Sequence, residues 1–359
     1  MLHGLYKRFS KDIGVDLGTA NTRVYVRDQG IVIDEPSVVA VNTKTDQILA
    51  VGNEAKQMLG KIPPHITVTR PLTGGVISDY EVTEKMLKFF IDKIHEGRFT
   101  LMARPEVVIG VPLEVTEVEV KAVEDAMIAA GAREVHVVQA PMAAAIGARM
   151  PIQDPVGNMI VDIGSGKTEV AVISLHGVVA WKSSTAAGDE MNRNIMQYAR
   201  EVFNLFVGES HAEQIKIKIG SALDLGERLE FPMRGRDVVT GLPKEIMIGS
   251  DHVREALART IHTITDLIKL TLEVTPPELT ADIHERGLLL TGGGSQFLGI
   301  DRVIAAATEV PVRIADDPLS AVVRGAGLLL DDQALLREVV MPSARDTKKK
   351  FGRERRRRL

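Results

Sequence analysis

The stretch IGVDLGTANT at residues 13–22 returns in altered form as MIVDIGSGKT at residues 159–168. Each copy reads as an apolar strand, an aspartate, an apolar residue and a glycine, then small residues and a threonine that opens more β-structure. The aspartates, Asp16 and Asp162, lie 146 positions apart, and the glycines two positions later keep that separation. Two copies of one strand–turn–strand unit, a domain apart, predict a duplicated fold with a cleft between its halves.

Composition sets the broad class. A chain of 359 residues predicts two or three domains at about 150 residues each. Apolar residues make up 45% and aromatic residues only 4%, so we expect an aliphatic core. The absence of cysteine excludes disulfides and thiolate metal sites, and it favours a reducing cytoplasm. No apolar run reaches the roughly 18 residues that cross a bilayer, and Met1–Ser10 is too short and polar for a secretory signal.

Charge is distributed unevenly along the chain. The segment Lys348–Leu359 holds eight basic residues and one glutamate, a net charge of +7, which leaves −11 on the rest of a chain whose total is −4. We expect residues 346–359 to form a disordered basic tail. Its partner stays open among anionic lipid, nucleic acid and plain solvent, although no specific nucleic-acid partner is expected.

Helical and strand patterns alternate, which predicts an α/β fold. Thr116 and Glu119 form a capping-box pattern before a helix over residues 117–130, and Gly131 ends it. An apolar stripe predicts a second helix over residues 254–274. The expected strands are residues 13–15, 23–26, 31–34, 38–41, 107–111, 135–138, 159–162, 169–174 and 288–291.

The repeated turns suit a phosphate site. A carboxylate at a strand end can hold hydrated Mg²⁺, and glycines let backbone N–H groups approach phosphate oxygens. One such turn alone is equally well a plain β-hairpin. Lys167 and Thr168 imitate a P-loop, but that motif requires glycine where Val161 stands, and an apolar alternation follows instead of a helix. A third glycine turn, residues 291–295, follows a predicted strand and precedes a predicted helix near residues 299–307.

These motifs carry a family resemblance. The two turns in register, the third glycine turn and PMAAAIGA at residues 141–148 resemble the actin superfamily. Within it, the chain is similar to the MreB family over about residues 10–330. The supporting stretches are EPSVVAV (35–41), AVGNEAKQMLGK (50–61), GVISDYEVTEKML (75–87), TEVAVISL (168–175), GRDVVTGLPKEI (235–246), LTGGGS (290–295) and DDPLSAVVRGAG (316–327).

The resemblance implies an actin-like fold: two large domains with duplicated ribonuclease-H-like cores, each with a small subdomain, around an ATP cleft. The expected boundaries are an apolar–basic segment at 1–10, domain I at 11–146 plus 328–345 with its small subdomain at about 34–73, and domain II at 147–327 with its small subdomain at about 186–252.

The resemblance also implies site residues. The two repeated turns would bind phosphates, Asp16 and Asp162 would flank Mg²⁺ through water, and Glu213 and Lys216 would contact adenosine together with the third glycine turn. Without the resemblance, Glu213 and Lys216 would be read as a solvated surface pair. The full expected set is Asp16, Gly18, Thr19, Ala20, Asn21, Asp162, Gly164, Ser165, Gly166, Lys167, Thr168, Glu213, Lys216, Gly292, Gly293, Gly294 and Ser295.

The chain departs from the family where hydrolysis is concerned. Where the family reads Glu-Glu-Pro-Met, with the second glutamate positioning water, this chain reads Gln139-Ala140-Pro141-Met142. Ala140 has no group that orients water, so we expect weakened hydrolysis and at most a slow ATPase. If both residues lie in a strand, Gln139 points to the opposite face, although a local backbone shift would let it substitute. Arg149 also replaces the usual glycine.

A membrane contact is expected at the apolar side chains Phe99, Leu101 and Met102, which Arg98 and Arg104 flank. The alternative is a loop folded onto the core. In the MreB family a loop at this place binds membrane, which favours the first interpretation.

The expected function is that of a cytoplasmic filament protein, peripheral on the inner face of the cell membrane. It would bind ATP, or alternatively GTP, with Mg²⁺, assemble with itself on anionic lipid, and determine cell shape by organising cell-wall elongation proteins. The alternatives are an ATP-dependent small-metabolite kinase of the same superfamily, which would need a carboxylate base in the cleft, and a chaperone, which would need a separate peptide-binding domain.

Overall fold

The computed structural model describes residues 10–95 and 104–342, and the chain divides into two compact units. Unit 1 is discontinuous and combines Met1–Met150 with Ser320–Leu359, whereas unit 2 is the continuous stretch Pro151–Leu319. Helix α11 (Ala321–Asp331) belongs to unit 1, because it packs against strands and a helix of that unit.

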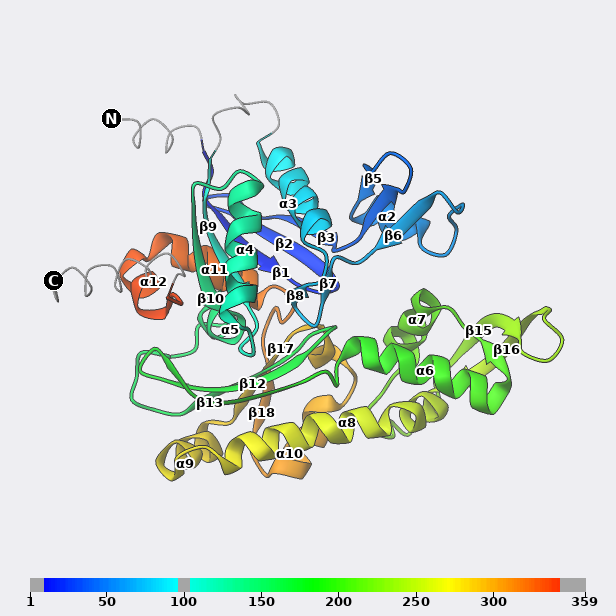
Figure 1. Ribbon diagram of the computed structural model, residues 1–359. Coiled ribbons are helices and arrows are strands. Elements are labelled where there is room, and N and C mark those ends of the chain that lie inside the picture. The colour runs from blue at the N-terminus through cyan, green and yellow to red at the C-terminus, as the bar shows by residue number, and fades with distance from the viewer. Residues whose placement is uncertain (1–9, 96–103, 343–359) are drawn as a thin grey trace. The chain divides into compact units, whose positions relative to one another are not determined.

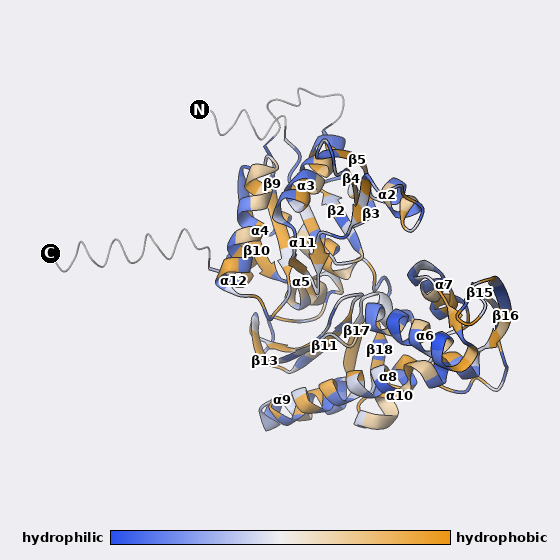
Figure 2. Ribbon diagram, turned by 45° about the vertical axis from the view of Figure 1, so that its right-hand side comes forward, coloured by the Kyte–Doolittle hydropathy of each residue, from blue (hydrophilic) through white to orange (hydrophobic). Residues whose placement is uncertain are grey.

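Unit 1 is built on a five-stranded sheet in the order β3–β2–β1–β9–β10 (Figure 1). The first three strands form an antiparallel meander, and β9 and β10 run parallel to β1. The strands are β1 (Ile13–Leu17), β2 (Asn21–Val26), β3 (Gly30–Pro36), β9 (Glu106–Val111) and β10 (Glu134–Gln139). Strand β9 is buried along its whole length and is largely hydrophobic (Figure 2).

Unit 2 repeats this plan with a sheet in the order β13–β12–β11–β17–β18. Its first three strands are again an antiparallel meander, and β17 and β18 run parallel to β11. The strands are β11 (Asn158–Ile163), β12 (Thr168–Ser174), β13 (Gly177–Ser184), β17 (Leu288–Thr291) and β18 (Val312–Ile314). The duplication predicted from the two sequence stretches is therefore confirmed, as are the α/β class and the predicted strands.

Helices cover both faces of the unit 1 sheet. Ile13, Val15 and Leu17 are buried in one cluster with side chains of α3 (Tyr80–Ile94) and α4 (Glu117–Ala129). The capping box that starts α4 is present, with Thr116 and Glu119 satisfying each other's backbone N–H groups. Because side chains alternate along a strand, Gly14 and Asp16 take the opposite face of β1, where α11 lies against Gly14.

Helix α11 lies unusually close to α5 (Ala140–Gly147). A Cβ atom added to Gly325 would lie 1.8 Å from the carbonyl oxygen of Ala143, and one added to Gly147 would lie 2.0 Å from that of Ala321. Glycine is thus required at both contacts, because any side chain would force the two backbones apart.

Smaller elements complete unit 1. A three-stranded sheet in the order β5–β4–β6 packs with α2 around Val38, Ala40 and Ala55. These and the remaining elements are β4 (Val39–Asn42), β5 (Gln47–Val51), α2 (Asn53–Met58), β6 (Ile66–Thr69), β7 (Leu72–Thr73), β8 (Val76–Ile77) and α12 (Gln333–Val339).

The long helix α8 (Ser250–Glu273) contributes Leu257, Ile261, Ile264 and Ile268 to the core of unit 2. It starts at Ser250, four residues before the predicted helix and directly after a strand that ends at Gly249. The other elements are α6 (Gly188–Phe203), β14 (Leu205–Phe206), α7 (Glu209–Ile219), β15 (Glu230–Asp237), β16 (Pro243–Gly249), α9 (Pro277–Arg286), the 3₁₀ helix η2 (Gly293–Gln296) and α10 (Ile300–Thr308).

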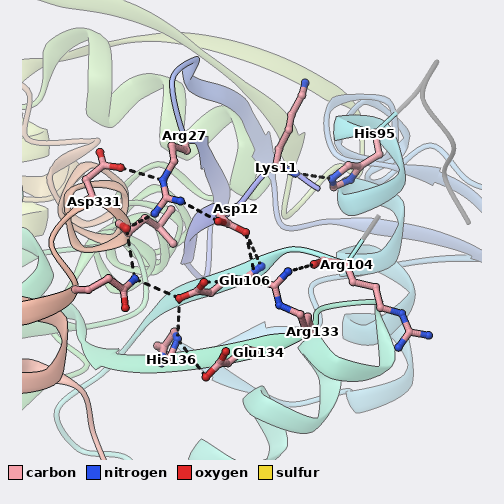
Figure 3. Close-up of polar contacts among 12 residues, drawn as sticks. Lys11, Asp12, Arg27, His95, Arg104, Glu106, Arg133, Glu134, His136 and Asp331 are labelled. Carbon is pink, nitrogen blue, oxygen red and sulfur yellow. Dashed lines mark hydrogen bonds and ion pairs between the residues drawn. The ribbon is translucent and has the colours of Figure 1, made fainter. Parts of the chain in front are cut away.

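A charged cluster occupies the end of the unit 1 sheet where the parallel strands begin (Figure 3). Glu106 is contacted by His136 Nε2 at 3.1 Å and Arg133 Nη2 at 3.5 Å. Arg27 binds Asp12 Oδ2 and Asp331 Oδ1, each at 2.9 Å, and so connects the residue before β1 to the last residue of α11. We call Asp12, Arg27, Glu106, Arg133, His136 and Asp331 the strand-end cluster.

Candidate functional site

The first repeated turn connects β1 to β2 at residues 18–20 and is fixed by neighbouring polar groups. The Ser37 hydroxyl donates to the Gly18 carbonyl at 2.6 Å, and the Gly75 N–H donates to Thr19 Oγ1 at 2.8 Å. A Cβ on Gly18 would lie 2.7 Å from the Asn21 carbonyl oxygen, so the turn closes this tightly only with glycine. Ala20 accepts a backbone hydrogen bond from Ser37.

Asp16, at the strand end before this turn, faces a cation. Arg23 on β2 stands opposite Asp16 in the strand register, and its Nη1 lies 3.7 Å from Asp16 Oδ2. Arg23 Nε also lies 3.2 Å from Asp34 Oδ1 on β3. The same Asp34 oxygen accepts a hydrogen bond from Asn21 Nδ2 at 2.8 Å. Asp16 and the first turn are thus tied to one guanidinium.

The second repeated turn connects β11 to β12 at residues 164–167. The Gly164 N–H donates to the Lys167 carbonyl at 2.9 Å, and an antiparallel strand follows, so the exclusion of a P-loop is confirmed. The Thr168 side chain is fully buried and donates to the Ala186 carbonyl at 2.7 Å. Its hydroxyl therefore holds the second turn to residue 186.

The N-terminus of α6 packs on the second turn. The Gly188 and Asp189 N–H groups donate to the carbonyls of Gly164 at 3.1 Å and Ser165 at 2.8 Å. Lys216 on α7 donates from Nζ to the Gly188 carbonyl at 3.0 Å. The structure thereby brings Lys216 to the second turn, and it places the half-buried Glu213 one helical turn earlier on α7.

The third glycine turn lies against Asp162. Gly292 has φ +77°, and a Cβ there would lie 2.4 Å from both Asp162 Oδ1 and the Ile163 carbonyl oxygen. Thr291 Oγ1 donates to Asp162 Oδ1 at 3.2 Å, and Ser295 Oγ donates to the Gly292 carbonyl at 2.7 Å. Unit 2 therefore gathers Asp162, the second turn and the third turn at the ends of neighbouring strands.

These features fit a phosphate and nucleoside ligand. Glycines at Gly164 and Gly188 keep the backbone open where two elements meet, and a Cβ on Gly188 would lie only 3.3 Å from the Ser165 Cα. Backbone N–H groups and lysine side chains are the usual partners of phosphate oxygens. Mg²⁺ typically binds one or two carboxylates together with water and phosphate oxygens, and Asp162 can provide a carboxylate.

The segment around Ala140 corrects one expectation. Strand β10 ends at Gln139, and Ala140 is the first residue of α5. Strand alternation therefore does not govern the relative directions of these two side chains. Ala140 lies beside Gly110, whose strand register pairs it with Asp16. A Cβ on Gly110 would lie 3.7 Å from the Ala140 Cα.

Phe99, Leu101 and Met102, residues 1–9 and the basic tail lie outside the described residues. Within the described part of the chain, no helix is long and apolar enough to cross a membrane.

Three contributors were missed from sequence. Arg23 carries a readable signal, because a charged residue alternates with apolar ones on a strand beside Asp16. Gly188 is a glycine at the start of a helix, which is weak evidence alone. Ser37 has no local signal, because its contact with Gly18 depends on the strand pairing of β2 and β3.

The duplicated core of three antiparallel and two parallel strands, with a carboxylate–glycine turn after the first strand of each copy, defines an actin-like protein. The family model described as MreB/Mbl protein matches residues 10–338. The chain therefore belongs to the MreB/Mbl family.

Curated relatives agree with this assignment. The cell shape-determining protein MreB of Escherichia coli K12 is 45% identical over 335 residues, covering 92% of this chain and 96% of that protein. The cell shape-determining protein Mbl of Bacillus subtilis 168 is 44% identical over 325 residues, covering 90% and 97%.

Solved structures show the same fold. MreB5 of Spiroplasma citri bound to ADP has a TM-score of 0.86 at 36% identity and covers 90% of this chain and 97% of its own. The same protein bound to AMPPNP has a TM-score of 0.86 at 35% identity, with the same coverage of both chains. A MamK double helical filament has a TM-score of 0.75 at 23% identity, covering 90% and 99%, and it supports the fold alone.

Proposed function

We propose that this chain is an ATP-binding, membrane-associated, actin-like filament protein that determines cell shape by organising cell-wall elongation. The observation that most supports this proposal is the pair of carboxylate–glycine turns at equivalent positions of the two units. Gly188, Lys216 and the third glycine turn of unit 2 lie at the second of these turns or beside Asp162. Solved structures of a relative with ADP and AMPPNP support adenine nucleotide as the ligand.

The proposed nucleotide contacts follow the predicted residues, with two refinements. Thr168 acts through the Ala186 carbonyl, so its role is to hold the second turn. Mg²⁺ was expected beside both Asp16 and Asp162, but Asp16 is ion-paired with Arg23. We therefore assign the principal protein contact of the metal, direct or through water, to Asp162.

Hydrolysis is proposed to be slow. Ala140 begins α5 beside Gly110 and offers only a methyl group where the family's glutamate would position water. Binding to the ground state remains while stabilisation of the transition state is lost, so bound nucleotide would turn over slowly. Gln139 stays the candidate substitute, because it caps α5 without donating or accepting a side-chain capping hydrogen bond.

Self-assembly, lipid binding and wall elongation belong to the same proposal. The curated relatives are cell shape-determining proteins. The comparisons do not favour the small-metabolite kinase, and Ala140 offers no carboxylate base. Membrane contact through Phe99, Leu101 and Met102 follows from their apolar, arginine-flanked sequence.

The decisive experiment has two parts. Calorimetry with ATP, ADP and GTP, each with Mg²⁺, is expected to show binding that Lys216→Ala weakens. Electron microscopy of the protein with ATP on anionic vesicles is expected to show filaments, and neutral vesicles serve as the control. Absence of nucleotide binding by the intact protein would contradict the nucleotide assignment. A protein that stays monomeric with ATP, Mg²⁺ and lipid would contradict assembly.

A further inference from the structure

Three charged residues form a ladder across the unit 1 sheet. Asp16 on β1 is registered opposite Arg23 on β2, and Arg23 is registered opposite Asp34 on β3. Directly opposed residues of antiparallel strands project from the same face, so the three side chains share one face. The Arg23 side chain is only 13% exposed, and its Nε and Nη1 atoms lie 3.2 Å and 3.7 Å from the two carboxylates.

The ladder lies next to the first repeated turn. Asp34 Oδ1 accepts from Arg23 Nε and also from Asn21 Nδ2, and Asn21 is the residue that follows the turn. One carboxylate oxygen therefore holds the guanidinium beside the turn. The ion pairs of Arg23 use its Nε and Nη1 atoms, and a guanidinium has five N–H donors, which is more than these two contacts use.

The duplication shows that this cation is particular to unit 1. Position 23 corresponds to position 169 under the 146-residue separation, and Glu169 on β12 is registered opposite Asp162. At equivalent positions, Asp16 therefore faces the guanidinium of Arg23, and Asp162 faces the carboxylate of Glu169. The Glu169 residue is only 4% exposed. One guanidinium is thus shared by the two carboxylates of Asp16 and Asp34 in unit 1, whereas position 169 in unit 2 places a second carboxylate opposite Asp162.

We propose that Arg23 is a phosphate-contacting residue that gives the first turn its own fixed cation beside Asp16. This inference rests on the proposed nucleotide binding and names a residue of that site. A guanidinium keeps its charge at every physiological pH, and its forked N–H groups match phosphate oxygens.

Calorimetry tests the inference with one substitution and a matched control. Arg23→Gln is expected to weaken ADP binding at least about tenfold, in Mg²⁺ and in excess chelator alike, because a charge-assisted hydrogen bond is lost. Arg27→Gln removes the same charge four residues further along, but Arg27 belongs to the strand-end cluster. Its ADP affinity is expected to stay within about twofold of the unaltered protein.

The outcomes separate this inference from the proposed function. If the unaltered protein binds no nucleotide, the proposed function fails first. If it binds ADP, and Arg23→Gln matches Arg27→Gln, the assignment of Arg23 is wrong. Thermal melts of the ligand-free variants identify misfolding, and Arg23→Lys, which keeps the charge, provides a second variant. Recovery of binding by Arg23→Lys in chelator supports the fixed cation, and loss equal to that of Arg23→Gln contradicts it.

Discussion

Replacing Gly325 by alanine should destabilise unit 1 strongly, because it inserts one methyl group between two helices that touch through their backbones. The new Cβ would lie 1.8 Å from the Ala143 carbonyl oxygen, whereas real Cβ contacts are essentially never below 3.0 Å. Helices α5 and α11 would have to separate by at least 1.2 Å. The obstacle is a backbone carbonyl in a buried helix, so no flexible side chain can relieve it.

The cost can be estimated from overpacked cores, in which an inserted methyl group typically costs 1–3 kcal/mol. We expect about 3 kcal/mol for Gly325→Ala because both helices are buried and must move together. A unit of this size loses about 2–4 °C of Tm per kcal/mol, so the melting temperature should fall by about 6–12 °C.

Circular dichroism of the ligand-free protein measures this shift. Gly177→Ala is the matched control, since its added Cβ would meet its nearest atom at an ordinary 3.6 Å. We expect that control to melt within about 2 °C of the unaltered protein. A Gly325→Ala protein that melts as the control does would refute the close packing of α5 and α11.

Three further predictions follow from single sites. Ala140→Glu should raise phosphate release at least about tenfold by restoring a water-positioning carboxylate; a variant no faster than the unaltered protein would assign that role elsewhere, with Gln139→Ala as the next test. Arg149 closes α5 in the left-handed region at φ +58°, so Arg149→Gly should stabilise the protein by about 1 kcal/mol, measured by urea unfolding; unchanged or lower stability would contradict it. The hydrogen bond from His136, with nearby positive charge, lowers the pKa of Glu106 from 4.5 to about 2, and the same contact raises the pKa of His136. The contribution of Glu106 to the free energy of unfolding should therefore be complete above about pH 4.5 and lost as pH falls towards 2. The contribution of His136 should be complete below pH 6.5 and lost as pH rises through the raised pKa of His136. His136→Gln should weaken the pH dependence of the urea midpoint of unfolding on both its acidic and its basic side, measured between about pH 3 and pH 8. An unchanged pH dependence would contradict the pairing of Glu106 with His136.

The sequence predicted local structure well where one segment contains its own signal. The two carboxylate turns repeat at one spacing, the Thr116–Glu119 box specifies the start of α4, and Val161 rules out a P-loop. Each turn, the capping box and the P-loop test depend on residues within about ten positions of one another, and the two copies of the turn can be aligned by sequence alone across the 146 positions between them.

The parts that could not be predicted depend on distant contacts. The apolar alternation before Gln139 gives no sign that the strand stops there, because the helix that follows is fixed by packing against α11, almost two hundred residues away in the chain. From the sequence, the Thr168 hydroxyl could donate a hydrogen bond to a phosphate. Its hydrogen bond to the Ala186 carbonyl is seen only in the structure. The position of Arg23 between Asp16 and Asp34 is known only once the register of three strands is known.

The discontinuity of unit 1 sets an order of events during synthesis. Helix α11 covers the face of β1 that bears Gly14, yet it is translated after all of unit 2. At about 5–20 residues per second, the ribosome needs roughly 10 to 30 s to pass from Met150 to Ser320. Through that interval the alanine-rich surface of α5 has no partner helix, whereas unit 2 has its complete sequence and can fold. The nascent chain therefore presents an apolar surface to chaperones until its final helices emerge.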